Sequence, residues 1–451
     1  MTTSSERVAR GQMWLDRCLS LFTEVRKGEG TGALLLAANV FCLLASYYLL
    51  KTVREALILS EGGAEVKSYA AGAQAMILML VVPAYGAFAS RVNRIRLING
   101  VMLFFVSHLV VFHQLAAHGV QIGVPFFLWV GIFNLVVVAQ FWAFANDLYT
   151  LERGQRLFPL IGIGASVGAL AGARLASGLM AAHAGPPRLL LIAAMGLMVC
   201  IGLTFCANHR ERCRHQPATS GPVDQRLGPE GGFRLIVTNS YLRLIALMVV
   251  LLNVVNTIGE YLLGKLVVAH TSRALVDGTA AGLTRSQLIG VFYGDFFGWV
   301  NLASLLIQLF VVSRVFKRIG IRGALFVLPL VAFASYGGLA LLPVLGALRI
   351  GKIFENSIDY SLQNTARHAL FLPTSREAKY KAKQAIDGFF WRVGDVLQAI
   401  CVFIGVRLAF DVPQFARLNQ LLVVVWLAVI VGIYREHKRV VAADEPARAA
   451  A

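Results

Sequence analysis

The sequence predicts an all-α, polytopic membrane protein with twelve transmembrane helices arranged as two six-helix halves. Three observations predict it: the residue composition, the number and length of the apolar segments, and the alternation of basic loops along the chain. Of the 451 residues, 57% are hydrophobic and only 15% are charged, and the mean hydropathy is +0.67. A soluble protein this apolar could not cover its surface with polar groups, so the composition excludes that class.

Twelve apolar segments each come close to the ~20 residues that an α-helix needs to cross a bilayer. The expected spans are 33–50, 68–90, 97–117, 122–146, 157–182, 188–207, 240–263, 286–312, 321–341, 343–372, 383–408 and 414–434. A linker that contains several Pro, Gly and Arg residues separates the first six from the last six. The predicted domains are a cytoplasmic segment 1–32, a six-helix bundle 33–207, a linker 208–239, a six-helix bundle 240–434 and a tail 435–451.

Basic residues are concentrated on one predicted side of the membrane. The formal net charge is +18, and most of the excess lies in the N-terminal segment, the linker, the tail and every second loop. The positive-inside rule places these parts, and hence both termini, in the cytoplasm of a bacterial inner membrane. This topology accounts for the charge without nucleic acid as a partner. Residues 12–26 have one apolar helical face, which predicts an amphipathic helix on the cytoplasmic membrane surface.

The two predicted halves resemble each other. Three pairs of short segments occupy equivalent places: 90–92 with 313–315, 47–50 with 260–263, and 150–153 with 374–377. Six spans, a cytoplasmic linker and six similar spans are typical of the major facilitator architecture, in which the substrate lies near the bilayer midplane between the halves. In the fifth span, Gly164, Gly168 and Gly172 form a doubled Gly-x3-Gly pattern, which is predicted to let helix backbones pack closely.

The stretch from Arg349 to Arg367 carries a stripe of charge inside a predicted span. Lys352, Glu355 and Asp359 follow at helical spacing, so they lie on or close to one face. An ionisable group at the centre of a span costs about 2.5–3.5 kcal/mol on insertion scales, and such groups normally face a bundle interior or water. The stripe is therefore predicted to line a transport cavity.

Polar groups in three other spans allow two interpretations each. Lys51 and Arg54 at the end of the first span are either snorkelling anchors or a cationic site for an anionic substrate. Asn253 and Asn256 share one face of the seventh span with a glutamate, and they either hold helices together or face a cavity. Asp295 in the eighth span either pairs with a basic residue or carries protons.

The sequence lacks the motifs of metal sites and of nucleotide hydrolysis. It has no HExxH, no paired-Cys motif and no GxxxxGK[ST] loop, and its six cysteines are scattered. We therefore expect no metal, no cofactor and no enzymatic activity. Any transport would be secondary-active.

Three stretches resemble the nucleotide transporter family, the ATP/ADP translocases of plastids and of obligate intracellular bacteria. They are YYLLKTVREAL (47–57), FWAFANDLYTLERGQRLFPLIGIGASVGA (141–169) and DYSLQNTARHALFLPTSREAKYKAKQAIDGFFWRVGD (359–395). Together with the order of the spans, the resemblance covers nearly the whole membrane region. It implies a twelve-span fold related to the major facilitators and an exchange of nucleotides such as ATP for ADP.

The resemblance also implies roles for single residues. The basic residue that the family uses in its first span falls on Arg54, and the one late in its tenth span falls on Arg367. Arginine can bind phosphate in a bidentate way. The acidic residue of the family's seventh span falls on Asn256, with Glu260 one turn away. The acidic residue of its fourth span falls near Val130, and this span has no Asp or Glu.

The predicted function is an antiporter of nucleotides, or of a related phosphorylated anion, with a cavity lined by spans 1, 4, 7 and 10. The expected partners are the transported anion and the lipid bilayer, and a monomer is the working assumption. The predicted substrate site divides into phosphate-binding cations (Lys51, Arg54, Lys352 and Arg367), amides for base or sugar (Asn134, Asn253 and Asn256) and carboxylates that pair with the cations in the empty state (Glu260, Glu355 and Asp359).

Two alternatives stay open. A proton-coupled transporter of another solute would keep the fold and would use Glu355, Asp359 or Asp295 as a proton carrier. A membrane scaffold or sensor would keep the fold without transport, although such a protein would have little reason to retain a buried stripe of charge.

Overall fold

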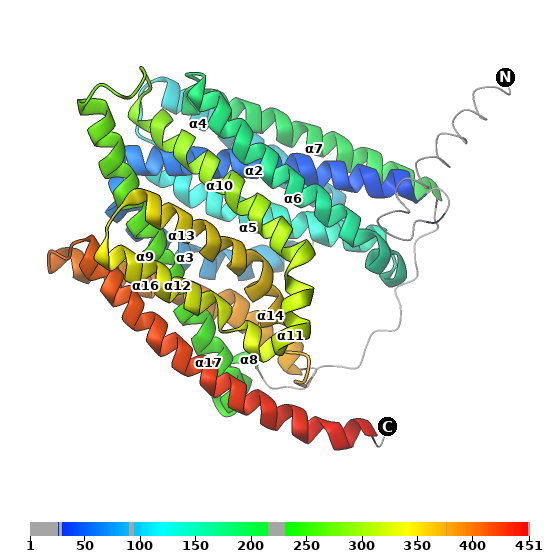
Figure 1. Ribbon diagram of the computed structural model, residues 1–451. Helices are drawn as coiled ribbons and strands as arrows, with labels where there is room; N and C mark the ends of the chain where they lie inside the picture. The colour runs from blue at the N-terminus through cyan, green and yellow to red at the C-terminus, as the bar shows by residue number, and fades with distance from the viewer. Residues whose placement is uncertain (1–25, 27–28, 90–93, 215–230, 376, 450–451) are drawn as a thin grey trace, which may run out of the picture. The chain divides into compact units, whose positions relative to one another are not determined.

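The computed structural model describes residues 26, 29–89, 94–214, 231–375 and 377–449, and all regular elements in these ranges are helical (Figure 1). The amphipathic helix expected at 12–26 and most of the expected linker lie outside the described residues. The elements are α2 (Gly30–Glu61), α3 (Gly63–Ala89), α4 (Arg94–Ala117), α5 (Gly123–Leu148), α6 (Leu151–Ala181), α7 (Pro186–Arg214), α8 (Gly232–Thr238), α9 (Ser240–Val276), α10 (Arg285–Phe310), α11 (Val312–Ala324), α12 (Val327–Leu341), α13 (Leu345–Ile358), η1 (Asp359–Gln363), α14 (Asn364–Ala369), η2 (Ala378–Ala382), α15 (Lys383–Ala385), η3 (Ile386–Phe390), α16 (Trp391–Arg407) and α17 (Val412–Ala449).

Ten of the described helical segments are long and apolar enough to cross a membrane. An eleventh candidate span is formed by α11 and α12 together, which are bent by 76° across a short break. Within α11, Gly320 has a φ of 68°, a left-handed conformation that glycine adopts without steric cost. The prediction of a helical, multi-pass membrane protein is confirmed, with ten or eleven spans by this criterion.

The expected span at 343–372 is built from three consecutive elements. α13, η1 and α14 follow one another without a gap. η1 is a single π-helical turn that begins at Asp359, and such turns within α-helices are frequent at functional sites. The stretch is continuous and long enough to cross a membrane, but it carries Arg349, Lys352, Glu355, Asp359 and Arg367. These are too many charged residues for it to count among the ten apolar spans.

The chain forms two compact units, which we describe separately. Unit 1 comprises Met1–Leu57, Gly86–Asp224 and Ser286–Gly298, and unit 2 comprises Ile58–Tyr85, Gln225–Arg285 and Trp299–Ala451. Unit 1 therefore holds most of α2, helices α4 to α7 and the first half of α10. Unit 2 holds most of α3, helices α8 and α9, the second half of α10 and all later elements.

In unit 1, α6 packs against α2 through its glycines. A Cβ built on Gly164, Gly168 or Gly172 would lie 2.5, 2.3 or 2.1 Å from a backbone carbonyl oxygen of α2. A real side chain cannot approach a carbonyl this closely, so the two backbones can meet only where α6 has glycine. The packing role that the Gly-x3-Gly pattern predicts is confirmed.

In unit 2, α9 is covered by its neighbours. It lies against α13, α16 and α17, and α12 lies against α13 and α17 (Figure 1). Tyr241 and Tyr261 of α9 and Trp426 of α17 are buried between these helices. Since α9 is enclosed in this way, its polar side chains must find partners on the adjacent helices. The buried seam between α9, α12 and α13 holds the candidate site.

Candidate functional site

Lys352 of α13 is fully buried, and oxygen atoms from two helices surround its ammonium group. Its side chain is 0% exposed. Nζ donates hydrogen bonds to Asn256 Oδ1 at 2.6 Å, to the Asn256 carbonyl at 3.2 Å and to Glu355 Oε1 at 3.1 Å. Glu260 Oε1 lies 3.7 Å from the same nitrogen. A buried ammonium group is stable only when it is paired and hydrogen-bonded, and both conditions are met here.

Other side chains hold the two carboxylates in place. The Tyr336 hydroxyl of α12 lies 2.8 Å from Glu355 Oε2 and 3.1 Å from Oε1, and it donates to this carboxylate. Asn356 Nδ2 donates to Glu260 Oε1 at 3.0 Å. The acceptors around the ammonium group are therefore oriented by neutral donors as well as by the lysine, so side chains of α9, α12 and α13 build one polar cluster.

The close approach of α12 and α13 to α9 depends on Gly259. A Cβ at this position would lie 2.0 Å from the Tyr336 hydroxyl and 3.1 Å from Lys352 Nζ. Glycine leaves room for both polar groups to reach α9. This residue therefore belongs to the cluster although it offers no side chain.

Asn253, one turn before Asn256 on α9, is bonded to a different helix. Its Nδ2 donates to the Trp391 carbonyl at 2.7 Å and to Asp395 Oδ1 at 2.8 Å. Arg392 Nη1 donates to Asp395 Oδ2 at 3.2 Å. In this structure Asn253 connects α9 to α16, and its contact with a substrate stays a prediction.

Arg367 of α14 lies in a second polar group of unit 2. Its guanidinium lies 5.0 Å from the centre of the Trp391 ring, and its Nε lies 3.9 Å from Asp387 Oδ1. Its Nη2 donates to Asn364 Oδ1 at 3.1 Å. Lys383 Nζ donates to the other Asp387 oxygen at 2.7 Å. The Arg367 side chain is 14% exposed, and its guanidinium lies between a ring and a carboxylate.

In unit 1, Arg54 has surroundings of the same kind. Its guanidinium lies 4.7 Å from the centre of the Phe127 ring, and its Nη2 lies 2.5 Å from Glu55 Oε1. The Arg54 side chain is 15% exposed. Lys51 Nζ lies 4.3 Å from the centre of the Phe297 ring. Both cations of the first span are thus placed over aromatic faces.

Three further residues that the sequence analysis singled out lie outside the polar groups described above. Asn134 of α5 is partly buried in unit 1. Asp359 is buried at the first position of η1 in unit 2. Asp295 of α10 forms an ion pair with Arg174 of α6 in unit 1, so the pairing interpretation of this aspartate holds in the structure.

Four of the ten predicted ligands come together in one cluster, namely Asn256, Glu260, Lys352 and Glu355. The sequence analysis missed three residues of the cluster, which are Gly259, Tyr336 and Asn356. It also missed Asn419 of α17, whose Nδ2 donates to the Val255 carbonyl beside the Tyr336 hydroxyl. Asn356 follows Glu355 of the charged stripe directly and could have been found from it. Tyr336 and Asn419 lie on other helices, and no spacing in the sequence relates them to Lys352.

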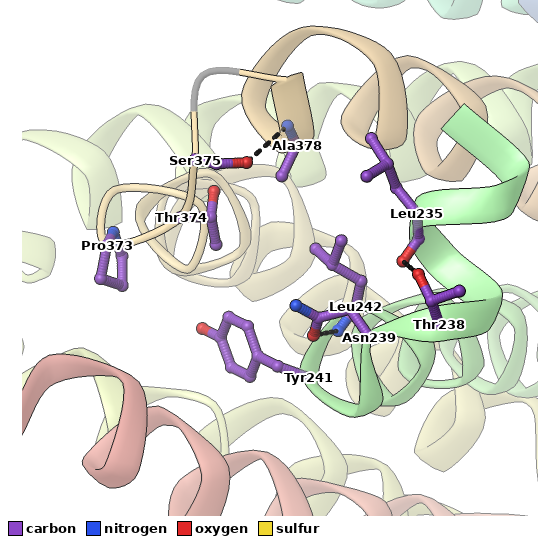
Figure 2. A pocket seen from close by; sticks show the side chains of 9 residues that line it. All are labelled: Leu235, Thr238, Asn239, Tyr241, Leu242, Pro373, Thr374, Ser375 and Ala378. Atoms are coloured by element: carbon purple, nitrogen blue, oxygen red, sulfur yellow. Dashed lines mark hydrogen bonds between the residues drawn. The ribbon is translucent and has the colours of Figure 1, made fainter. Parts of the chain in front are cut away.

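A pocket of 340 Å³ lies elsewhere in unit 2, where α9 begins (Figure 2). Two of its polar side chains cap the first turns of helical segments. Asn239 Oδ1 accepts from the Leu242 backbone N–H at 3.2 Å, and Ser375 Oγ accepts from the Ala378 N–H at 3.3 Å. The Tyr241 hydroxyl donates to the Leu370 carbonyl at 2.9 Å. None of the predicted ligands lines this pocket, so we do not assign the substrate to it.

The chain matches the family model described as TLC ATP/ADP transporter over residues 126–437, which is more than half of its length. Among curated proteins, it is 25% identical over 334 residues to the chloroplastic ADP,ATP carrier protein 2 of Arabidopsis thaliana, covering 65% of this chain and 51% of the relative. It is 21% identical over 490 residues to the ADP,ATP carrier protein 1 of Rickettsia bellii (strain RML369-C), covering 92% of this chain and 95% of the relative. The chain spans about half the length of the plastid relatives that it matches.

The chain is also similar in structure to solved transporters. The nucleoside transporter NupG superposes with a TM-score of 0.61 at 12% identity, covering 91% of this chain and 98% of that one. A POT family transporter in complex with 5-aminolevulinic acid superposes with a TM-score of 0.62 at 13% identity, covering 93% and 98%. At this identity the likeness shows the fold alone. The expectation of a major-facilitator-like fold is confirmed.

Proposed function

The chain belongs to the TLC ATP/ADP transporter family, and from this premise we propose that it is a secondary-active antiporter that exchanges nucleotides, such as ATP for ADP, by alternating access. The family is one of membrane transporters and not of enzymes. The relatives are named ADP,ATP carrier proteins, and we infer the exchanged nucleotides from these names. The surroundings of two arginines support an anionic, phosphate-bearing substrate.

The observation that carries the proposal is that two arginines, Arg54 in unit 1 and Arg367 in unit 2, each lie over an aromatic ring and near a carboxylate. Each guanidinium lies over an aromatic face, at 4.7 Å from the ring centre of Phe127 and 5.0 Å from that of Trp391. Each also has one carboxylate within ion-pair distance. The ring restricts the orientation of the guanidinium plane, and the carboxylate neutralises its charge while no anion is bound.

A phosphate group would replace the carboxylate at each arginine. The guanidinium fork suits bidentate binding of phosphate oxygens, and part of the ordering cost is already met because the ring holds the plane. Lys51 would add a second positive charge beside Arg54, and Asn134, Asn253 and Asn256 would hydrogen-bond base or sugar. Lys352 keeps its carboxylate partners in this proposal and does not bind phosphate itself.

We further propose a topology of twelve spans in two six-span halves, 33–207 and 240–434, in a bacterial inner membrane. The stretch 345–369 is the tenth span in this scheme, with η1 as a bulge inside it. Both termini lie in the cytoplasm because the basic loops do. The transporting unit is a monomer, and the substrate lies between spans 1, 4, 7 and 10.

The test is counter-exchange in proteoliposomes. Vesicles with purified protein and internal ADP should take up labelled ATP, and vesicles without internal nucleotide should not. Arg54→Gln and Arg367→Gln should each lower the initial rate about tenfold or more, because a charge-assisted, bidentate contact is lost. A lack of counter-exchange with every nucleotide and phosphate ester offered would overturn the proposal.

Arg407→Gln is the matched control. Arg407 also lies over a ring, at 5.3 Å from the centre of Phe403, but it is exposed at the end of α16. Its loss should leave the rate of exchange unchanged. A fall as large as that of the Arg54 and Arg367 variants would show that the assay responds to any arginine removed from this protein.

Proton-coupled transport of another solute is the second candidate function. The observation that favours it is Asp359, a buried carboxylate in the same span as Lys352 and one turn beyond Glu355. Glu355 is less suited to carry a proton because it already accepts a hydrogen bond from the lysine. If uptake stops when the proton gradient is collapsed, and internal nucleotide has no effect, this candidate replaces the antiporter.

A further inference from the structure

We propose that the cluster around Lys352 is a binding site for a monovalent cation, and that the ammonium group of the chain's own lysine occupies it. Four oxygen atoms lie between 2.6 and 3.7 Å from Nζ: Asn256 Oδ1, the Asn256 carbonyl, Glu355 Oε1 and Glu260 Oε1. We call these four atoms the oxygen cage. Carbonyl, amide and carboxylate oxygens are hard ligands of the type that binds metal cations in proteins, and carbonyl oxygens coordinate Na⁺ in secondary transporters.

Neutral donors hold the two carboxylates of the oxygen cage in addition to the lysine. The Tyr336 hydroxyl donates to the Glu355 carboxylate, and Asn356 Nδ2 donates to Glu260. Tyr336 is itself located by α9 and α17, since its hydroxyl lies 3.5 Å from the Val255 carbonyl, to which Asn419 Nδ2 donates at 3.0 Å. If the lysine side chain were truncated, these donors would keep the carboxylates near their present positions.

A further oxygen supports the assignment to a cation. Asn356 is buried, and among the described residues its Oδ1 has no hydrogen-bond partner, while its Nδ2 is bonded to Glu260 of the oxygen cage. An acceptor atom left over on an amide that is bonded to Glu260 suits a positive ligand and not an anion. The occupant that the structure shows is an ammonium group with one positive charge, so a monovalent cation in its place would restore the charge of the present arrangement.

The tethered ammonium group has a consequence for transport. A free cation in the oxygen cage could dissociate and would have to be supplied from one side of the membrane in each cycle. The ammonium group of Lys352 cannot leave, so its positive charge stays beside Glu260 and Glu355 throughout the cycle. Exchange by the native protein should therefore be the same in sodium, potassium or a large organic cation. This part of the inference rests on the proposed function, whereas the stability test below does not.

The test is the thermal stability of Lys352→Ala in different chloride salts at equal ionic strength. Truncation removes the charge and opens space, leaving the buried Glu355 and the partly buried Glu260 without their cation. Ligands that bind the folded state raise its unfolding temperature, so KCl or NaCl should raise the midpoint of Lys352→Ala by about 3 °C or more over N-methyl-D-glucamine chloride, with saturation. The wild-type protein should show no difference between these salts.

Three variants serve as controls for this measurement. Lys352→Met removes the same charge but fills the space, so it should be destabilised without responding to the salt. The double variant Lys352→Ala/Glu355→Gln removes a cage carboxylate and should also lose the response. Lys265→Ala breaks an ion pair with Glu65 in which the lysine is 35% exposed, so water and any salt can replace it without selectivity.

The outcomes are distinct. A saturable response to sodium or potassium in Lys352→Ala alone supports the cation site. The proposal is overturned if Lys352→Ala is equally unstable in all three salts, if it is not recovered folded in any of them, or if lowering the pH alone restores its stability. No nucleotide enters these measurements, so failure of nucleotide exchange would leave the result intact.

Discussion

At the scale of single residues, the three cations that are central to the two proposals each have partners. Arg54 and Arg367 each have a ring and a carboxylate, and Lys352 has the four atoms of the oxygen cage. An isolated charge in a membrane interior costs several kcal/mol, because water is not there to solvate it. Substitution of one member of such a group will therefore change the environment of the others. The stability changes of single variants within a group will not add in the double variant.

Gly259→Ala should destabilise the protein by about 1–3 kcal/mol, because the new methyl group would overlap the Tyr336 hydroxyl. The measurement is the midpoint of thermal unfolding in detergent. Gly338→Ala in α12 is the control, since a Cβ there has no heavy atom within 4 Å and alanine favours the helix by about 1 kcal/mol. Equal midpoints for the two variants would contradict the close approach of α12 to α9.

Helical spacing explains how much of the site could be predicted at this scale. Side chains three or four residues apart share a face, so the sequence placed Asn256 near Glu260 and Lys352 near Glu355. The pairing of Lys352 with Asn256 depends on how α13 is rotated and translated against α9. That geometry is set by the packing of apolar side chains along both helices, so it cannot be predicted from a short sequence motif.

At the scale of elements, η1 divides the charged stripe that the sequence predicts. A π-turn inserts about one extra residue, which rotates the following part of the helix by about 100°. Lys352 before the turn contacts α9, while Arg367 after it contacts η3 and α16. Uniform helical spacing would put both on nearly one face. The structure separates them because the helix between them is not a regular α-helix.

Another link between elements joins the chain before α2 to the first turns of α6. Arg156 Nη1 and Nη2 donate to the two oxygens of Glu29 at 3.0 and 3.2 Å, and Arg153 Nε lies 3.2 Å from Glu29 Oε1. Burial acts to raise the pKa of the Glu29 carboxyl, but the hydrogen bonds from Arg156 and from the Arg26 backbone N–H outweigh it. The pKa of Glu29 is therefore below its usual value of 4.5.

Glu29→Gln should destabilise the folded protein at neutral pH by about 2 kcal/mol, the contribution of hydrogen bonds to a charged group. A carboxyl whose pKa is lowered by folding contributes its stability in full above the unfolded pKa and loses it as the pH falls through the folded pKa. The difference in unfolding midpoint between wild type and Glu29→Gln should thus be constant above about pH 5.5 and shrink below 4.5. A difference independent of pH would show that the ion pair with α6 is absent.

At the scale of the whole molecule, the alternation of basic loops predicts which side of the membrane each loop occupies. A fluorescent protein fused after α17 should fluoresce, because both termini are expected in the cytoplasm. Alkaline phosphatase inserted between α9 and α10, at residues 277–284, should be active because this loop is expected outside. The reverse pattern would exclude the twelve-span topology with cytoplasmic termini, whereas the fold itself would be unaffected.

By itself, the sequence determined the class of protein, the approximate spans and the polar face of each helix. These are local properties: hydropathy, charge and helical period are carried by neighbouring residues. They were enough to find the charged stripe, the Gly-x3-Gly packing surface and the family resemblance, and the family match and the structural likeness confirm the class and the fold.

Only the tertiary structure decided which polar faces meet. It placed Tyr336 on Glu355, divided the stripe at η1 and paired Asp295 with Arg174. The physical reason is that a buried polar group must find its partner on whichever helix packs beside it, and the packing of helices depends on residues far apart in the chain. The oxygen cage around Lys352 is therefore visible only where α9, α12 and α13 come together in the folded protein.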